Sequence, residues 1–335
     1  MKAARIDQIN IGLIILSFAL AIWLPIHLFL FAYIVLGPLH YLTEIGWLNK
    51  RDFFVKKRRD SWLLVLLCIV VSVAYYLNKG DFGADAQVNS WQHYVHRFNA
   101  VAGGGLVFFA FAAALILGFI KQENFKFGLL VFAGICALFV HKINFVLVLF
   151  GILVPTIIHV SLFTALFMLY GALKSQSKWG YLSVILFLIG CVGIFFTSKS
   201  PTSVNAAQDS LQVLLDSSFI HLGALLTELV GARESGSDYM LLTEIGIKIQ
   251  SFFAFCYTYH YLNWFSKTKV INWHEVSKNW LIGTFILWSL ALLLYMIDYT
   301  IGFMALFFLS LLHVFLEFPS NHQSVYGIIN VIRRR

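Results

Sequence analysis

Charged residues are scarce in this sequence of 335 residues. They make up 12% of the chain, while hydrophobic residues make up 60%. An ordinary soluble domain carries about 25% charged residues. Because so few charges cannot cover a surface exposed to water, the composition excludes an ordinary soluble protein.

Cysteine is also scarce, and its spacing supplies no structural motif. The four cysteines lie inside apolar runs without paired spacing: Cys68, Cys136, Cys191 and Cys256. The pattern therefore indicates neither a disulfide framework nor a zinc finger. The sequence also lacks an internal repeat of the solenoid kind and a low-complexity tract.

Long apolar runs are abundant instead. Many reach roughly 18 residues, the length that crosses about 30 Å of hydrocarbon as a helix. The sequence predicts an all-α, polytopic membrane helical bundle, a single transmembrane domain over residues 1–335 with about nine transmembrane helices. The expected spans are 11–39, 61–78, 98–120, 127–141, 145–173, 179–198, 240–265, 280–298 and 301–319. The first run is too long for the core of a signal peptide and lacks a small-residue cleavage motif, so we interpret it as a retained span.

Basic residues in the short connections predict the orientation, because Lys and Arg mark the cytoplasmic side. With nine spans, the basic connections fall on one side: 50–59, 121–126, 174–178, 267–269 and 333–335. This places the N-terminus outside and the C-terminus in the cytoplasm. Lys2, Arg5 and Lys142 fall on the opposite side. Segment 199–239 becomes an extracytoplasmic loop, a re-entrant segment or part of a cap.

The same distribution explains the net charge of +8. Binding of nucleic acid would need basic residues gathered on one face beside aromatic platforms. Here they are spread over several connections, so we expect membrane lipid and no nucleic acid as a partner. The sequence leaves the oligomeric state open.

Titratable side chains inside the spans are the candidates for function, because burying them in hydrocarbon is costly. His40 and Glu44 lie four residues apart at the end of the first span and share a helix face. His313 and Glu317 repeat this spacing at the end of the last span. His260 is expected at a similar depth on the same side.

Imidazole and carboxylate groups on facing helices suit iron or zinc. We predict a metal site, with Fe(2+) favoured and zinc as the alternative, near the cytoplasmic side. The predicted ligands are His40, Glu44, His159, His260, His313 and Glu317. His159 lies deeper in its span and joins the others only if that helix is tilted or ends earlier than expected. For any single His and Glu pair, a structural role as an interfacial ion pair is an equal alternative.

Three further histidines lie at the opposite ends of the spans. His93 and His96 are three residues apart, and His141 follows another span. A second, outer metal site remains an open alternative, because a pair of histidines without a carboxylate partner is a weak pattern.

The segment Gly37-Pro-Leu-His40-Tyr-Leu-Thr-Glu44 reads G-x-x-H-x-x-x-E. It resembles the G-x-x-H-x-x-x-D element of the Brp/Blh family of bacterial integral-membrane β-carotene dioxygenases, which are proposed to bind iron through histidines. The likeness extends to chain size, span number and a late span with a histidine, here His313. Glu44 stands where the family has Asp, and Tyr41 where it usually has a small residue. The resemblance implies a multi-pass protein of the bacterial inner (plasma) membrane and a lipophilic small-molecule substrate.

Three functions follow as hypotheses. The first is a membrane-embedded metal-dependent oxidoreductase, a non-haem iron oxygenase acting on a carotenoid- or lipid-like substrate. The second is a transporter or channel that uses the same His and Glu residues for protons or cations. The lack of repeated halves and the gathering of polar residues at one depth disfavour it. The third, a membrane scaffold, leaves the convergence of these residues unexplained.

Overall fold

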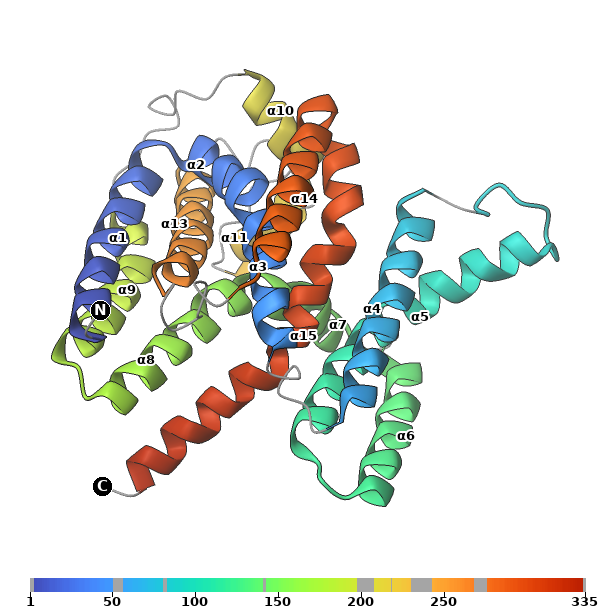
Figure 1. The fold of residues 1–335 in the computed structure, drawn as a ribbon. Coiled ribbons are helices and arrows are strands. Elements are labelled where there is room, and N and C mark those ends of the chain that lie inside the picture. The colour runs from blue at the N-terminus through green and yellow to red at the C-terminus, as the bar shows by residue number, and fades with distance from the viewer. Residues whose placement is uncertain are drawn as a thin grey trace. The chain divides into compact units, whose positions relative to one another are not determined.

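The fold is known from a computed structural model. It describes residues 3–50, 57–80, 83–140, 143–197, 208–217, 219–229, 243–267 and 276–333. Within these ranges every regular element is a helix (Figure 1). Among them, eight helices are long and apolar enough to cross a membrane, or nine if the bent pair Trp91–Phe98 and Gly103–Phe119 is one span. The all-helical fold is thus confirmed, and the chain has the character of an integral membrane protein.

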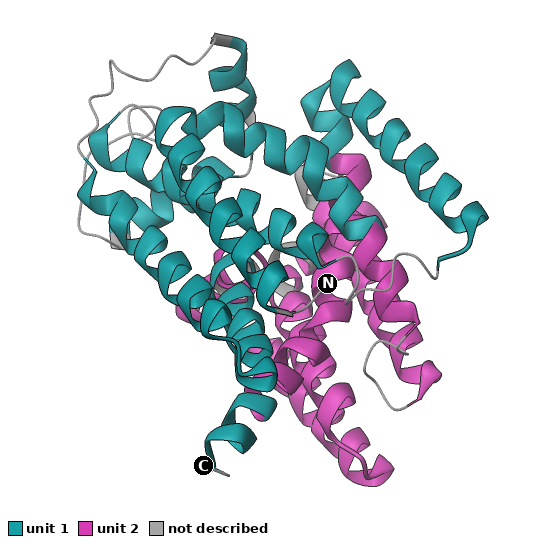
Figure 2. Ribbon diagram, turned by 60° about the vertical axis from the view of Figure 1, so that its left-hand side comes forward, with its two compact units in different colours: residues 1–42, 160–303, 327–335 teal, residues 43–159, 304–326 magenta. Residues whose placement is uncertain are grey.

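Internal contacts divide the chain into two compact units (Figure 2). Unit 1 comprises residues 1–42, 160–303 and 327–335, and unit 2 comprises residues 43–159 and 304–326. The boundaries fall inside continuous helices, which are α3 (Gly37–Asn49), η3 (Leu149–Phe163) and α15 (Tyr299–Arg333). These three helices therefore belong partly to each unit.

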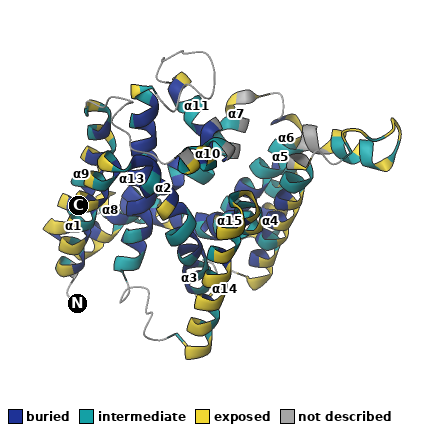
Figure 3. Cartoon of the chain, turned by 90° about the horizontal axis from the view of Figure 1, so that it is seen from above, coloured by how far each residue is buried: buried dark blue, intermediate teal, exposed yellow. Residues whose placement is uncertain are grey.

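Unit 1 is organised around one buried helix, α13 (Glu244–Ser266). The other elements complete in this unit are α1 (Ala3–Trp23), α2 (Pro25–Phe31), η1 (Ala32–Leu36), α8 (Thr164–Ser175), α9 (Lys178–Gly193), η4 (Ile194–Phe196), α10 (Gln208–Asp216), α11 (Phe219–Leu229) and α14 (Lys278–Ile297). Helices α1, α2 and α9 pack against α13, which is buried along most of its length (Figure 3). Polar side chains on α13 find partners there: the Tyr259 hydroxyl donates to the Asn10 side-chain oxygen over 3.2 Å.

Helix α13 corresponds to the expected span 240–265, yet it is not among the eight candidate membrane spans. It is 23 residues long, so length is not the reason. Its polar residues lower its hydropathy, and neighbouring helices cover them. A helix enclosed by protein does not need the uniformly apolar surface of one that faces lipid.

The expected first span, 11–39, is interrupted at Leu24. Helix α1 ends at Trp23, and α2 begins at Pro25, whose missing N–H costs nothing at the first helical position. Between them Leu24 has φ −131° and ψ 58°, outside the helical region. Ala4–Trp23 and Pro25–Asn49 are both long and apolar enough to cross a membrane. One predicted crossing therefore becomes two candidate spans.

Unit 2 contains four complete helices, α4 (Arg58–Lys79), α5 (Trp91–Phe119), α6 (Glu123–Val140) and α7 (Asn144–Val148), with most of η3 and the middle of α15. In its core the Phe111 ring packs against Phe315 and Phe318, with centroids 4.8 and 5.0 Å apart. A Cβ at Gly105 on α5 would lie 2.3 Å from the Ala137 carbonyl oxygen on α6. The missing side chain at Gly105 thus permits close packing of α5 against α6.

Helices α6 and α14 expose apolar side chains along their length. Of the most apolar window of α14 only 11% is buried, against 61% for Pro25–Asn49. The exposed residues of α14 include Ile282, Ile286, Leu290 and Leu293. A helix that stays apolar on its exposed side is suited to contact with lipid tails.

Candidate metal centre

Two of the predicted histidine ligands lie in or just after a π-helical segment. Segment η1 ends at Leu36, four residues before His40, and η3 contains His159. Inside η3, Pro155 lacks an N–H and cannot continue a regular α-helix without a clash. The wider π turns accommodate it, and the Thr156 hydroxyl donates to the Ile152 carbonyl. Such turns are rare and often occur at functional sites.

Unit 1 holds His40 and His260 together. Their Nε2 atoms lie 3.2 Å apart, and His40 is only 1% exposed. On the other side of the His260 ring, Nδ1 lies 2.7 Å from the Thr164 hydroxyl oxygen. The contact with Thr164 fixes how the His260 ring is turned, so that its Nε2 points toward His40.

Unit 2 holds His159, His313 and Glu317 together. The rings of His159 and His313 have centroids 5.2 Å apart and meet edge to face. Nδ1 of His159 lies 3.3 Å from Oε2 of Glu317. With Nδ1 turned toward this carboxylate, Nε2 of the same ring is left available as a metal ligand. His159, from a distant part of the chain, therefore lies beside both members of the predicted pair His313 and Glu317.

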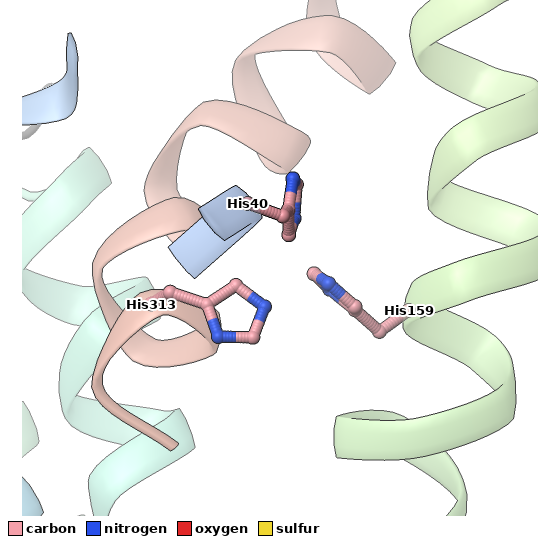
Figure 4. A group of neighbouring side chains, drawn as sticks. All are labelled: His40, His159 and His313. Atoms are coloured by element: carbon pink, nitrogen blue, oxygen red, sulfur yellow. The ribbon is translucent and has the colours of Figure 1, made fainter. Parts of the chain in front are cut away.

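Three buried histidines form a group that could hold a metal ion. A ring nitrogen from each of His40, His159 and His313 lies within 4.8 Å of the other two, and all three residues are buried. Figure 4 shows the three imidazoles from their separate helices turned toward one another. From the sequence, His159 is expected deeper in its span than the other predicted ligands. In the structure it belongs to this group.

The three donors fit a metal ion by chemistry and by spacing. Histidine nitrogens bind zinc at about 2.0–2.1 Å, so two ligands of one ion lie no more than about 4.2 Å apart. Small side-chain rotations bring nitrogens within 4.8 Å of one another to that spacing. Imidazole is a common ligand for iron and zinc alike, so the group does not distinguish between these metals.

The other predicted ligands are Glu44, His260 and Glu317. Glu317 contacts His159, and His260 contacts His40. Glu44 is buried on α3, one turn beyond His40, and is 2% exposed. Their roles as direct ligands stay predictions. Thr164 belongs to the site through His260 and carried no signal in the sequence.

The glycine that opens the G-x-x-H-x-x-x-E segment has a packing role. The hydroxyls of Tyr41 and Tyr261 lie 3.0 Å apart. A Cβ at Gly37 would lie 3.1 Å from the Tyr41 hydroxyl oxygen and 3.3 Å from that of Tyr261. The missing side chain thus makes room for this tyrosine pair, and the Tyr261 ring centroid is 5.0 Å from that of His40.

In the described part of the chain the outer histidines form no comparable group. His93 lies in the first turn of α5, where its backbone N–H donates to the Ser90 side chain, the N-cap of the helix. His96 lies one turn further and is half-buried, while His141 lies outside the described residues. The second, outer metal site stays a hypothesis. Comparisons with protein-family models, curated proteins and solved structures found no match.

Proposed function

We propose that the protein is an integral-membrane, metal-dependent oxidoreductase, a non-haem iron oxygenase that acts on a lipophilic, carotenoid- or lipid-like substrate. The observation that carries the proposal is the group of three buried histidines, His40, His159 and His313, whose ring nitrogens lie within 4.8 Å of one another. Three imidazole nitrogens gathered at one buried point are a donor set that suits a metal ion such as iron or zinc.

The choice of iron rests on ligand chemistry. Iron(II) bound by histidine and carboxylate side chains, with positions left open, supplies the activation of dioxygen in non-haem oxygenases. His40, His159 and His313 would hold the ion. His260 is the candidate for a fourth nitrogen ligand, because its Nε2 lies 3.2 Å from that of His40, close to the roughly 3.3 Å between two nitrogens of a tetrahedral site.

Residues around the ligands orient them and keep water away. The Glu317 carboxylate lies 3.3 Å from Nδ1 of His159, and the Thr164 hydroxyl is hydrogen-bonded to Nδ1 of His260. Aromatic rings cover the His40 imidazole, with centroids 5.0 to 6.5 Å away; these belong to Tyr41, Tyr261, Trp264 and Phe265. An aromatic, water-poor surrounding suits an apolar substrate that arrives from the bilayer.

The resemblance of Gly37–Glu44 to the Brp/Blh element supports the same chemistry and a location in the bacterial inner membrane. It concerns one short segment, and within that segment the structure explains the Gly37 position by the tyrosine pair. Exposed apolar residues on α6 and α14 support a membrane location.

Metal analysis of the purified full-length protein tests the proposal. We expect about one iron per chain by elemental analysis, and its loss in His40→Ala and His313→Ala. The matched control is His322→Ala, a half-buried histidine on the same helix as His313, which should keep its iron. Wild-type protein that folds without any metal would contradict the proposal. If such metal-free protein conducted protons or cations in proteoliposomes, the transporter hypothesis would replace it.

A further inference from the structure

Two cysteines that are far apart in the sequence meet inside unit 1. Cys191 lies near the end of α9 and Cys256 in the middle of α13, and their Sγ atoms are 3.9 Å apart. Both are free thiols. They are separated by 65 positions, so their spacing in the sequence gave no sign of the pair.

The backbones of α9 and α13 approach closely at this point. A Cβ at Gly190, next to Cys191, would lie 2.7 Å from the Phe255 ring, next to Cys256. Phe255 also packs against Phe187 on α9, with ring centroids 5.4 Å apart. The missing side chain at position 190 therefore lets the helices come near enough for the two sulfurs to touch.

The two thiols differ in how accessible they are. Cys256 is fully buried, whereas Cys191 is half-buried on a helix whose neighbouring residues Ile189 and Val192 are exposed. A small oxidant can reach Cys191 first. Cys256 is then the thiol within reach of the oxidised sulfur.

We propose that Cys191 and Cys256 form a redox-active dithiol, which a two-electron oxidant of the peroxide class converts into a disulfide joining α9 to α13. The Cys191 sulfur attacks the peroxide, the O–O bond breaks, and a sulfenic acid and one water form. The Cys256 sulfur then attacks the sulfenic sulfur, the S–O bond breaks, and a second water leaves with the thiol hydrogen. Both sulfurs are oxidised, the peroxide is reduced, and two thiol hydrogens end in water.

Closing the bond needs only a local movement. A disulfide requires sulfurs about 2.05 Å apart, and the observed separation of 3.9 Å is within the range that rotation of two cysteine side chains spans. The bond would fix α13 one helical turn before His260. Forming this disulfide requires no metal ion, because only the two thiols and the oxidant take part.

Thiol counting on the full-length protein in lipid nanodiscs tests the proposal. The reduced protein is treated with hydrogen peroxide, denatured and alkylated with N-ethylmaleimide, and the labels are counted by intact mass. We expect the wild type to lose two of its four reactive thiols. Peptide mapping without reductant should find residues 191 and 256 in one cross-linked pair within a single chain.

Cys191→Ser and Cys136→Ser form the matched variants, because both cysteines are half-buried in helices. Cys136→Ser should still lose two thiols to peroxide, and Cys191→Ser should keep all three. Peroxide-treated wild type in which Cys191 and Cys256 both remain alkylated would overturn the proposal. So would cross-links that join two chains, or that form equally in Cys191→Ser. Because the peptide mapping uses wild-type protein, it tests the proposal even if one of the variants does not fold.

Discussion

Nδ1 of His159 lies 3.3 Å from the Glu317 carboxylate, a contact between the π-helix η3 and helix α15. The sequence alone pairs Glu317 only with His313, on the same helix. We propose that Glu317 orients the imidazole of His159, because a carboxylate beside Nδ1 favours one tautomer and one direction of the ring.

Replacing this carboxylate should weaken metal binding without unfolding the protein. For Glu317→Gln we expect the affinity for iron to fall about 10- to 100-fold, the range typical of groups that hold a metal-binding histidine. Competition with a chelator of known affinity measures the change. Glu244→Gln is the control, because this exposed carboxylate pairs with Lys248 on the first turn of α13. Equal affinities for the two variants would exclude the orienting role.

A side chain at Gly37 should disturb the tyrosine pair beside His40. Gly37→Ala places a Cβ about 3 Å from the Tyr41 hydroxyl oxygen, so we expect a loss of roughly 1 kcal/mol in stability from overpacking. Thermal unfolding in detergent measures it. Gly12→Ala on α1, where a Cβ meets no atom within 4 Å, should be neutral or stabilising. Tyr41→Phe, which removes the nearest atom, should partly rescue Gly37→Ala; if it does not, the crowding explanation is wrong.

Removing only one partner of a buried ion pair in unit 2 should cause a large loss of folding stability. Lys126 Nζ lies 2.6 Å from Asp60 Oδ2, and both side chains are 5% exposed. Lys126→Met leaves a buried carboxylate without this cation, and we expect a loss on the order of 3 kcal/mol. The double variant Lys126→Met with Asp60→Asn should recover much of it. Arg59→Ala, at a side chain 70% exposed, should change little. Denaturant titration measures the free energy of unfolding of each variant and so checks this order of stabilities. A double variant as unstable as Lys126→Met would contradict the pairing.

The break at Leu24 changes the expected side of the N-terminus. Nine spans place it outside, but two crossings in place of the first bring Lys2 and Arg5 to the side of Lys50, in agreement with the positive-inside rule. We therefore expect a cysteine in place of Lys2 to resist a membrane-impermeant maleimide in intact cells and to react after permeabilisation. A cysteine in place of Asp85, between α4 and α5, should react in intact cells. Labelling at position 2 in intact cells would restore the nine-span orientation.

Much of the site could be predicted because helical spacing is local. The four-residue steps from His40 to Glu44 and from His313 to Glu317 place each pair on one face, and the basic connections bring His260 to a similar depth. The position of His159 was harder to predict. The π-helix around Pro155 changes the rotation and rise per residue, so the α-helical spacing used for the prediction does not apply there. The contact of Thr164 with His260 depends on packing between distant segments. Pro25, by contrast, is a recognisable signal for the start of a helix. The continuous apolar run around it nevertheless led to the prediction of a single span.

Helix α13 has a consequence for how the protein is made. It carries His260 and Cys256, yet its hydropathy is too low for it to rank with the candidate spans. A segment of this kind enters the bilayer poorly by itself during synthesis, and we expect it to be retained there only once α1, α2 and α9, which precede it in the chain, can receive it. The helices would then insert in a fixed order. Helix α13, which brings His260 to His40, would enter the membrane after the helices that enclose it.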